Sequence, residues 1–584
     1  MNNSLRRAGT ACVAACALSV LLLAGGCRKA RKTTSAPNTT DYSDNLEAIV
    51  PETSHPFLHW PDVSDYQPYI KTFYEDRNYE IGWTRDGKPT PAALGFMQAF
   101  ANAAYKGLNP EDYDSSRWAA RVQALSPQNE DGVAQFDVAM TVCVMRYISD
   151  LRIGRVNPQH FNFDINVAQK KYDLAEFVSD NAVDVTDVPK LIATVEPDSE
   201  PYRETERALA TYLVLAKQQQ VDSDLPLAEV KAPVSEGESY EAAQALLERL
   251  QIEGDIKASD VPDTPQPKVF NKLLSDGVKS FQHRHGLTED GKLTPQTVQE
   301  LNVPLSARVM QLQDSLERWR WLPDQYVNPR LMVNLPEFVL RGYTSDHQLD
   351  FTMRVVVGKV VGEHQTPVFA HMMKYLIFRP YWNVPVDIAR KELVPHLAGN
   401  PHYLESHNFE VVTSKGQVLT SYTTKQVAEG AVMVREKPGP KNSLGLVKFM
   451  FPNQYDIYLH STPATELFNR TRRDFSHGCV RVQKPEDLAA WLLDGQQDRG
   501  GDAWDLEQVH EAMTAGPDNH QVNLKAPVPI VIFYITAEVE PDGHVHFFDD
   551  IYGYDQQLEK VLANGPPYPM KPEVASKNKP GDTV

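Results

Sequence analysis

The sequence predicts a multidomain α+β protein. With 584 residues the chain is too long for one domain of the usual size. Apolar residues recur at helical spacing within residues 53–235 and again in a compact stretch at 236–305. From 306 to 561 the pattern changes to short β-branched runs separated by Gly, Pro and Asn, which is typical of a β-rich domain. We therefore expect a helical scaffold domain, a small helical domain and a β-rich domain, in that order.

The first of these regions is predicted to be a scaffold without chemistry of its own. Helical periodicity is present in residues 92–100 and in 136–151, and residues 107–113 break it. Cys143 lies in the second apolar run. We interpret it as a small core side chain, because free cysteines in apolar runs are mostly buried.

The compact stretch from 236 to 305 has clear helix boundaries. Apolar residues at helical spacing end at Phe281, and Gly286 follows as a stop signal. Thr294 and Pro295 mark the start of the next helix, as a capping residue and a first-turn proline.

The string from 278 to 302 resembles the small three-helix peptidoglycan-binding domain found on many cell-wall enzymes. Its histidines, His283 and His285, are expected at surface or groove positions rather than as metal ligands, because no cluster of partner ligands lies nearby in the sequence.

The β-rich region contains one interruption. A helix is expected first, at 312–322, packing back on the scaffold. Residues 386–440 are polar and helix-prone, which suggests a capping insertion, and residues 562–584 are predicted to be a disordered tail. Strands are predicted at 331–335, 338–340, 353–358, 447–451, 456–459 and 529–534.

Residues 1–26 are typical of an export signal. Arg6 and Arg7 precede an uncharged, mostly apolar stretch, and small residues lead up to Cys27. This junction resembles a bacterial lipoprotein cleavage site, which would make Cys27 the lipidated first residue of the mature chain. Simple secretory cleavage and an uncleaved anchor stay open as alternatives.

The predicted location of the mature chain is the periplasm. Residues 27–52 are predicted to form a flexible tether, and Arg28 favours the outer membrane for a lipidated chain. A net charge of −19 argues against nucleic acid as a partner, because phosphate binding needs a basic face. After the signal, no run reaches the about 18 apolar residues needed to span a bilayer.

Cys479 carries the functional prediction. Exported proteins use cysteines mainly in disulfides, and with Cys143 assigned to the core Cys479 is an unpaired thiol. His477 lies two residues before it and His460 nineteen residues before it. The thiolate is the nucleophilic form, and an imidazole base within hydrogen-bond reach generates it. Gly478 lets the backbone approach closely, so that neighbouring amides could stabilise an oxyanion.

The His-Ser pair at 460–461 and the Ser-His-Gly-Cys run at 476–479 resemble the signature of the L,D-transpeptidases, which have a YkuD-like catalytic β-domain. The resemblance implies that Cys479 is the nucleophile, His460 the general base, and Ser461 the residue whose backbone carbonyl orients that base. It also implies that the loop and the oxyanion site are shaped by His477 and Gly478, and that the substrate cleft is lined by Tyr458, Ser476, Arg481 and Trp382.

Two of these positions, Ser461 and Trp382, need a further remark. Many members of the family have Gly where this chain has Ser461, which leaves the orienting contact less certain. For Trp382 an ordinary core position is the alternative. The chain resembles the large subclass with a scaffold, a peptidoglycan-binding module and a capped catalytic domain. Segments 380–385 and 437–445 match that subclass too and are expected to flank the cap and the substrate groove.

The resemblance implies a reaction that needs no metal or other cofactor. A donor stem peptide is cleaved between its third residue, a diamino acid, and its fourth, D-alanine. The acyl group on Cys479 then passes to the side-chain amine of another stem, which gives a 3→3 cross-link. Peptidoglycan stem peptides are the expected partners, and carbapenem-type inhibitors are expected to acylate the same thiol.

Three alternatives stay open. Water could take the acyl group, which would make the chain an L,D-carboxypeptidase or endopeptidase. His460, His477 and Cys479 could be zinc ligands of a metallopeptidase. A lipid and a binding module could also tether membrane to wall without any enzymatic activity.

Overall fold

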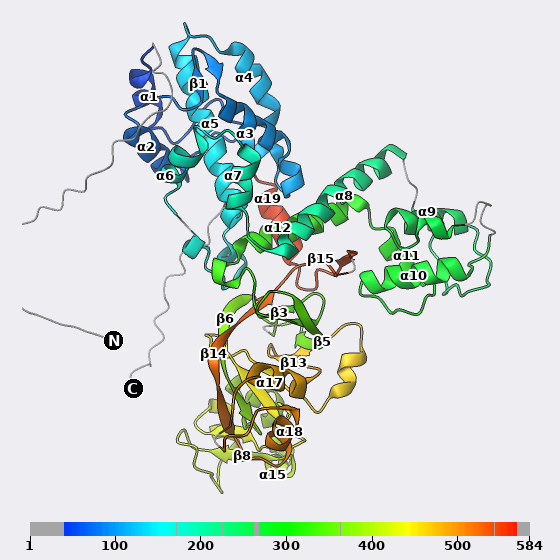
Figure 1. Cartoon of the computed structure of the whole chain (residues 1–584). Coiled ribbons are helices and arrows are strands. Elements are labelled where there is room, and N and C mark those ends of the chain that lie inside the picture. The colour runs from blue at the N-terminus through cyan, green and yellow to red at the C-terminus, as the bar shows by residue number, and fades with distance from the viewer. Residues whose placement is uncertain are drawn as a thin grey trace, which may run out of the picture. The chain divides into compact units, whose positions relative to one another are not determined.

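The computed structural model describes residues 40–170, 172–222, 226–261, 268–362, 364–498, 500–541 and 543–568. By its contacts the chain divides into residues 1–41 and one unit from 42 to 584, and all elements below belong to the second unit. The predicted signal and Cys27 lie outside the described residues. Helices make up the first half of the chain and most strands lie in the second half (Figure 1), so the multidomain α+β class is confirmed.

The scaffold is built around α5, a helix that is buried on nearly all sides. Most of its side chains are buried, Cys143 among them, as the sequence predicted. A helix of this kind needs neighbours on every side, and the shorter helices of the region supply them. The elements are α1 (Ser43–Ile49), α2 (Gln67–Asp76), β1 (Thr84–Arg85), β2 (Lys88–Pro89), α3 (Pro91–Ala101), η1 (Ala103–Lys106), η2 (Pro110–Tyr113), η3 (Ser115–Arg117), α4 (Trp118–Ala124), α5 (Glu130–Ile153), η4 (Pro158–Phe161), η5 (Val167–Lys170), α6 (Leu174–Phe177), η6 (Val178–Ala182), α7 (Val188–Val195) and α8 (Glu200–Asp222).

The small helical unit has its own apolar cluster, and its predicted boundaries are confirmed. The Thr294 side chain accepts a hydrogen bond from the Thr297 amide at 3.1 Å, one residue before Pro295 opens the helix. Gly286 follows the preceding helix with a φ of +60°, in the left-handed region that glycine adopts without strain. The elements are α9 (Ala243–Ile252), η7 (Ala258–Asp260), α10 (Lys272–Arg284) and α11 (Pro295–Leu301).

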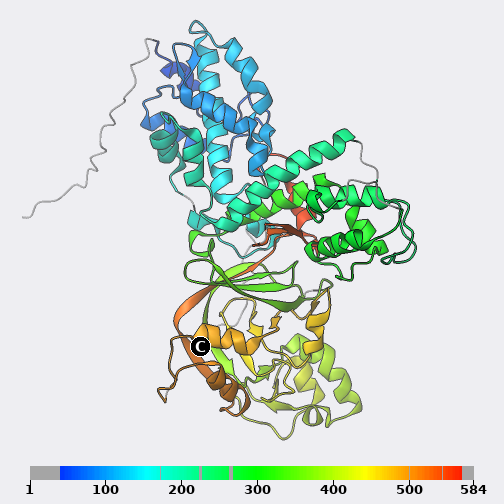
Figure 2. The ribbon, with the colours of Figure 1, turned by 45° about the vertical axis from the view of Figure 1, so that its right-hand side comes forward.

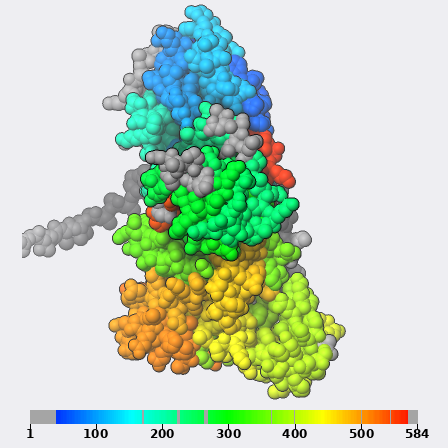
Figure 3. Space-filling model, turned by 90° about the vertical axis from the view of Figure 1, so that its right-hand side faces the viewer, coloured from blue at the N-terminus to red at the C-terminus, as the bar shows by residue number. Residues whose placement is uncertain are grey.

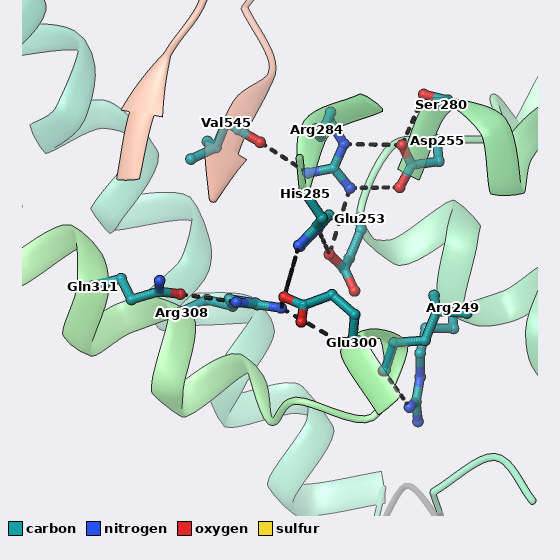
Figure 4. A network of polar contacts seen from close by, with 11 residues as sticks. Arg249, Glu253, Asp255, Ser280, Arg284, His285, Glu300, Arg308, Gln311 and Val545 are labelled. Carbon is teal, nitrogen blue, oxygen red and sulfur yellow. Dashed lines mark hydrogen bonds and ion pairs between the residues drawn. The ribbon is translucent and has the colours of Figure 1, made fainter. Parts of the chain in front are cut away.

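A buried group of charged side chains, here called the Arg284 network, joins this unit to α12 (Leu305–Trp321) and to a C-terminal hairpin (Figure 4). Arg284 donates to Asp255 at 2.9 Å and to the carbonyl of Val545 at 2.9 Å. The network consists of Glu253, Asp255, Arg284, His285, Glu300 and Arg308.

The expectation of a surface or groove position is wrong for His285. Its side chain has 0% exposure, with Nδ1 3.2 Å from Glu300 and Nε2 3.7 Å from Glu253. His283 is exposed as expected and contacts Glu289 at 3.0 Å. Sequence spacing could not separate the two histidines, because α12 and the hairpin that cover His285 come from later parts of the chain.

Helix α12 packs along α8 of the scaffold (Figure 2), which confirms the predicted helix and its packing. Arg320 donates to the Tyr202 hydroxyl at 2.8 Å. Glu317, fully buried on the same helix, pairs with Arg155 at 3.1 Å. Apolar and ionic contacts therefore both hold this helix to the scaffold.

The β-rich domain is a nine-stranded sheet that closes on itself. Its order is β12-β5-β13-β11-β10-β6-β14-β3-β4, and β4 also pairs with β5. The predicted final strand at 529–534 coincides, except for its last residue, with the end of the much longer β14, which runs between β6 and β3. The strands are β3 (Leu331–Asn334), β4 (Val339–Tyr343), β5 (Leu349–Gly358), β6 (Phe369–Phe378), β10 (Val447–Met450), β11 (Leu459–His460), β12 (Asp474–Ser476), β13 (Val480–Val482) and β14 (His520–Phe533). Helical elements of this domain are η8 (Asp324–Tyr326), η10 (Thr465–Asn469), α17 (Pro485–Leu493) and α18 (Leu506–Thr514).

The predicted insertion at 386–440 forms a cap with its own apolar cluster. In Figure 3 its yellow-green residues form a separate lobe on the face in view. It also contains two strands that the sequence did not predict, and these form a three-stranded sheet with β7 in the order β7-β9-β8. The elements are β7 (Trp382–Asn383), α13 (Val386–Ile388), η9 (Ala389–Leu393), α14 (Val394–Gly399), α15 (Tyr403–Ser406), β8 (Phe409–Val412), α16 (Thr424–Glu429) and β9 (Met433–Glu436).

The chain continues past the sheet into β15 (Ala537–Val539), β16 (Val545–Phe547) and α19 (Tyr554–Leu562). Residues 563–568, which fall in the predicted disordered tail, have a defined place, because Tyr568 donates to Asp112 at 2.8 Å. The rest of the predicted tail lies outside the described residues. No helix within the described ranges combines the length and hydrophobicity needed to cross a bilayer.

Candidate active site

The strand register brings the predicted nucleophile and base to one face of the sheet. β11 and β13 are parallel, with His460 opposite Arg481 and the buried Leu459 opposite Val480. The pairing extends one residue further, since the Val480 amide donates to the carbonyl of Tyr458 at 3.1 Å. Side chains alternate along a strand. The face opposite to Leu459 and Val480 therefore carries Tyr458, His460, Cys479 and Arg481.

The Cys479 thiol is half-buried on this face. It donates to the carbonyl of Asp456, with 3.7 Å between Sγ and O. Burial raises the pKa of this thiol to about 11, although hydrogen bonds from Tyr458 and the charge of Lys448 act in the opposite direction. In the free protein at neutral pH, Cys479 is therefore a protonated thiol.

His460 is buried and has the tautomer that a base needs. Its Nδ1 lies 2.5 Å from the carbonyl oxygen of Ser461. A carbonyl can only accept, so Nδ1 carries the proton and Nε2 has a free lone pair. Burial first, and then the charges of Arg481 and Lys448, lower the pKa of His460 to about 3. The imidazole is neutral at physiological pH and can accept a proton.

Ser461 makes the contact that was expected of it through its backbone. Its amide donates to the carbonyl of Val447 at 2.9 Å, which fixes the position of the residue beside β10. Gly445 lies against its side chain, at φ +61°, and a Cβ there would come 2.4 Å from Ser461 Oγ. A serine is accommodated after the histidine because a glycine faces it.

The loop that carries the nucleophile is fixed from both sides. Thr366 donates to the carbonyl of Gly478 at 2.7 Å, and the Gly478 amide donates to Ser476 Oγ at 3.1 Å. That amide is thus already bound within the loop, so the predicted oxyanion role of Gly478 does not involve a free amide. The φ of +119° at Gly478 favours glycine there.

His477 points to the cap rather than to the thiol. Its Nε2 lies 2.8 Å from Glu392, in η9 of the cap, and its ring is 4.9 Å from that of His364. The two histidines of the motif therefore have different partners. The described part of the chain holds no group of three His, Cys, Asp or Glu residues that could bind a metal, so the zinc alternative gains no support from this geometry.

The contacts of Trp382 are with the cap. Its half-buried ring lies 6.5 Å from that of Phe409 and packs against the cap cluster. Asn442 joins the two ends of the cap, donating to the carbonyls of Pro380 at 3.2 Å and of Lys437 at 2.9 Å. Segments 380–385 and 437–445 thus flank the cap as predicted, while the place of Trp382 in a substrate cleft stays a prediction.

Lys448 is a site residue that the sequence analysis missed. It lies on β10 directly opposite His460, and its ammonium group is 5.5 Å from the centre of the Tyr458 ring. Burial lowers the pKa of Lys448, and the charge of Cys479 raises it. The alternation of Val447, Lys448 and Phe449 could have placed this lysine on the polar face of its strand, but not beside the thiol.

Comparison with known families agrees with this architecture. Residues 328–506 match the L,D-transpeptidase catalytic domain family (YkuD). Residues 68–209 match a scaffold domain, and residues 236–301 match a family described as "Putative peptidoglycan binding domain". The predicted resemblance is thereby confirmed at the level of domain matches: the catalytic, scaffold and peptidoglycan-binding families each match a segment of the chain. The matches lie within the predicted domain ranges, whose exact ends stay predictions.

One curated relative and two solved structures complete the comparison. A "Putative L,D-transpeptidase" of Haemophilus influenzae is 30% identical over 304 residues, which are 51% of this chain and 58% of the relative. The chain thus matches less than two thirds of that relative. An L,D-transpeptidase crystal structure from Xylanimonas cellulosilytica aligns with 53% of this chain and 100% of its own, at 12% identity and a TM-score of 0.16. A fused Zn-dependent amidase/peptidase/peptidoglycan-binding protein from Clostridium acetobutylicum aligns with 52% of this chain and 99% of its own, at 12% identity and a TM-score of 0.14. TM-scores this low do not show a fold shared with this chain.

Proposed function

We propose that this protein is a peptidoglycan L,D-transpeptidase that forms 3→3 cross-links through a thioester on Cys479. One observation carries the proposal: His460 Nδ1 is bound to the Ser461 carbonyl, which leaves Nε2 as a proton acceptor on the sheet face that holds the thiol. A thiol and an oriented imidazole on one face are the equipment of nucleophilic acyl transfer. The match of residues 328–506 to the catalytic domain family supports the same reaction.

The proposed reaction has two proton transfers in each half. Sγ of Cys479 attacks the carbonyl carbon of the third stem residue while its proton passes to Nε2 of His460. The imidazolium then protonates the departing D-alanine amine, and the thioester remains. In the second half the side-chain amine of an acceptor stem attacks the thioester and gives its proton to His460. The Cys479 thiolate leaves and regains a proton from the imidazolium.

The fate of the acyl group decides between transfer and hydrolysis. The cap, tied to the nucleophile loop through the His477–Glu392 contact, supports a covered cleft that admits a second peptide. A covered site also excludes water, which favours transfer over hydrolysis. We therefore place the carboxypeptidase and endopeptidase reactions second.

Incubation of the purified protein with disaccharide-tetrapeptide, followed by mass analysis, tests the proposal. The expected product is a dimer that has lost one D-alanine, and a monomeric tripeptide would mean hydrolysis instead. Cys479→Ala should give neither product, whereas Cys143→Ala should give the same product as the wild type. Equal product from Cys479→Ala would refute Cys479 as the nucleophile, and no product from the wild type would leave the wall anchor. A carbapenem should add its mass to the peptide that contains Cys479.

The proposed location is the periplasm, with the chain attached to the outer membrane by a lipid on Cys27. The support is the sequence of the N-terminal 27 residues. Metabolic labelling with palmitate in a bacterial host should label the wild type and not Cys27→Ala. Equal labelling of the two, or none of the wild type, would leave simple secretory cleavage or an uncleaved anchor.

A further inference from the structure

Lys448 lies at the catalytic site, but the reaction described above gives it no role. It projects from β10 onto the face that carries His460 and Cys479, where its side chain is half-buried. Removing a lysine side chain from water costs free energy unless a partner compensates. The group whose negative charge favours its ammonium form is the thiolate of Cys479, which is present only once that thiol has lost its proton. The burial of this cation on the face that carries the proposed nucleophile indicates that it has a role in the site.

Tyr458 connects the two groups. The ammonium group of Lys448 is 5.5 Å from the centre of the Tyr458 ring, and Tyr458 in turn forms a side-chain hydrogen bond with Cys479. A cation over a phenol ring is attracted to its face. It also makes the phenol hydroxyl a better donor, because it stabilises negative charge on that side chain. Lys448 can therefore act on the sulfur both directly and through Tyr458.

We propose that Lys448 is a positioning residue of the catalytic site, whose ammonium group stabilises the Cys479 thiolate that forms as the proton passes to His460. The inference deepens the proposed function and rests on it in taking Cys479 as the nucleophile. Lys448 touches the acyl group in no step; it acts on the reaction through Cys479 and Tyr458.

The other charged groups around the thiol favour Lys448 for this role. Asp456, just before β11, raises the pKa of Cys479, so it opposes the thiolate. Arg481 is the second cation on this face, but its charge is shared between Cys479 and Glu466.

The remaining ionisable neighbours supply no positive charge to the sulfur. His460 is neutral at physiological pH, because burial lowers its pKa to about 3. On the cap side, His477 is bound to Glu392. Both cations on this face interact with the charge of Cys479, but Lys448 lowers the pKa of that thiol whereas Arg481 shares its charge with Glu466.

Alkylation of Cys479 measures this effect without any peptidoglycan substrate. The full chain is treated with iodoacetamide, from which the thiolate displaces iodide, at pH values from 6.5 to 10. The rate is followed by the mass of the peptide that contains Cys479, which separates it from the other cysteines. Lys448→Met is compared with Lys448→Arg and with Lys374→Met, an exposed lysine on the neighbouring strand β6 as control. Thermal unfolding checks that each variant folds, and Lys448→Gln replaces Lys448→Met where the latter does not.

The expected result is a rate–pH curve for Lys448→Met that lies about one pH unit above the wild type, hence about tenfold slower alkylation at pH 8. Lys448→Arg should stay within about threefold, and Lys374→Met should match the wild type. Superimposed curves for Lys448→Met and wild type would overturn the inference. So would a loss seen with iodoacetate and not with iodoacetamide, since Lys448 would then bind a carboxylate of the reagent. The proposed function fails separately, if the wild type forms no product from disaccharide-tetrapeptide.

Discussion

The Cys479 site and the Arg284 network both bury ionisable groups, and burial has opposite outcomes in the two places. In the network, burial alone would raise the pKa of Glu253. The contact with His285 and the charges of Arg284 and Arg308 outweigh it and hold that pKa at about 2. At Cys479, burial outweighs the hydrogen bonds of Tyr458 and the charge of Lys448, and the pKa of the thiol rises to about 11.

The difference shows that the charges around a buried ionisable group decide whether it has a structural or a chemical role. Each carboxylate of the network faces at least one guanidinium or imidazole, so its charged form is the stable one and the elements stay joined. The thiol has weaker compensation, so its stable form is neutral and its anion is reactive. Four predictions test this contrast, in order of decreasing effect.

Loss of the proposed base, His460, should have the largest effect. His460→Gln removes the lone pair of Nε2, and product formation from disaccharide-tetrapeptide should fall about 10³-fold, equivalent to about 4 kcal/mol of barrier. The rate of dimer formation by mass analysis gives the measurement. His510→Gln, an exposed histidine on α18, is the matched control and should leave the rate unchanged. If His460→Gln kept more than a tenth of the activity, another group would be the base.

Breaking the Arg284 network should lower the stability of the protein and leave the residues of the Cys479 site unchanged. Arg284→Met leaves Asp255 and Glu253 buried without their cation and should lower the free energy of unfolding by about 3 kcal/mol. The matched control is Lys272→Met, whose exposed ion pair with Asp276 should contribute less than about 1 kcal/mol. Hydrogen exchange of α9 to α11 measures the local loss. Unchanged protection in Arg284→Met would show that the charges are not mutually dependent.

The two regions should respond to pH in different ranges, although network stability and alkylation of Cys479 both increase with pH. Folded pKa values of about 2 for Glu253 and Glu300 lie below the ordinary value of 4.5. Their stabilisation is therefore present above pH 4.5 and is lost as the pH falls toward 2, on the order of 2 kcal/mol per group. Hydrogen exchange at pH 6, 4 and 3 should show this loss in wild type and a flatter dependence in Glu253→Gln/Glu300→Gln. Alkylation of Cys479 should instead rise with pH toward the thiol pKa of about 11. A plateau below pH 8 would contradict the raised pKa.

The smallest effect is expected at Ser461. The group that orients His460 is the Ser461 carbonyl, which every residue has, so Ser461→Gly should change the rate of product formation by less than about threefold, or about 0.6 kcal/mol. Steady-state rates of the two proteins give the comparison. A loss of more than about 30-fold would mean that the hydroxyl itself takes part in the reaction.

Local signals made most of the fold predictable. Thr294 and Pro295 marked the start of α11, because capping and the fixed φ of proline depend only on neighbouring residues. The long apolar run around Cys143 was also predictable as a buried helix, because its helical periodicity is a property of neighbouring residues. The strands of the cap, β8 and β9, were missed because each pairs only four residues within a polar, helix-prone segment.

What the sequence by itself determined is the presence of a thiol and an imidazole, Cys479 and His460, at the spacing on which the proposed function rests, and the order of the domains. Residue type and spacing specify a thiol, an imidazole and their loop, and these are local properties. Tertiary structure alone decided that Lys448 lies beside the thiol and that His285 is buried between Glu253 and Glu300. Both facts depend on strand register and on packing between segments far apart in the chain, and burial sets the balance of charges there. No window of neighbouring residues contains that information.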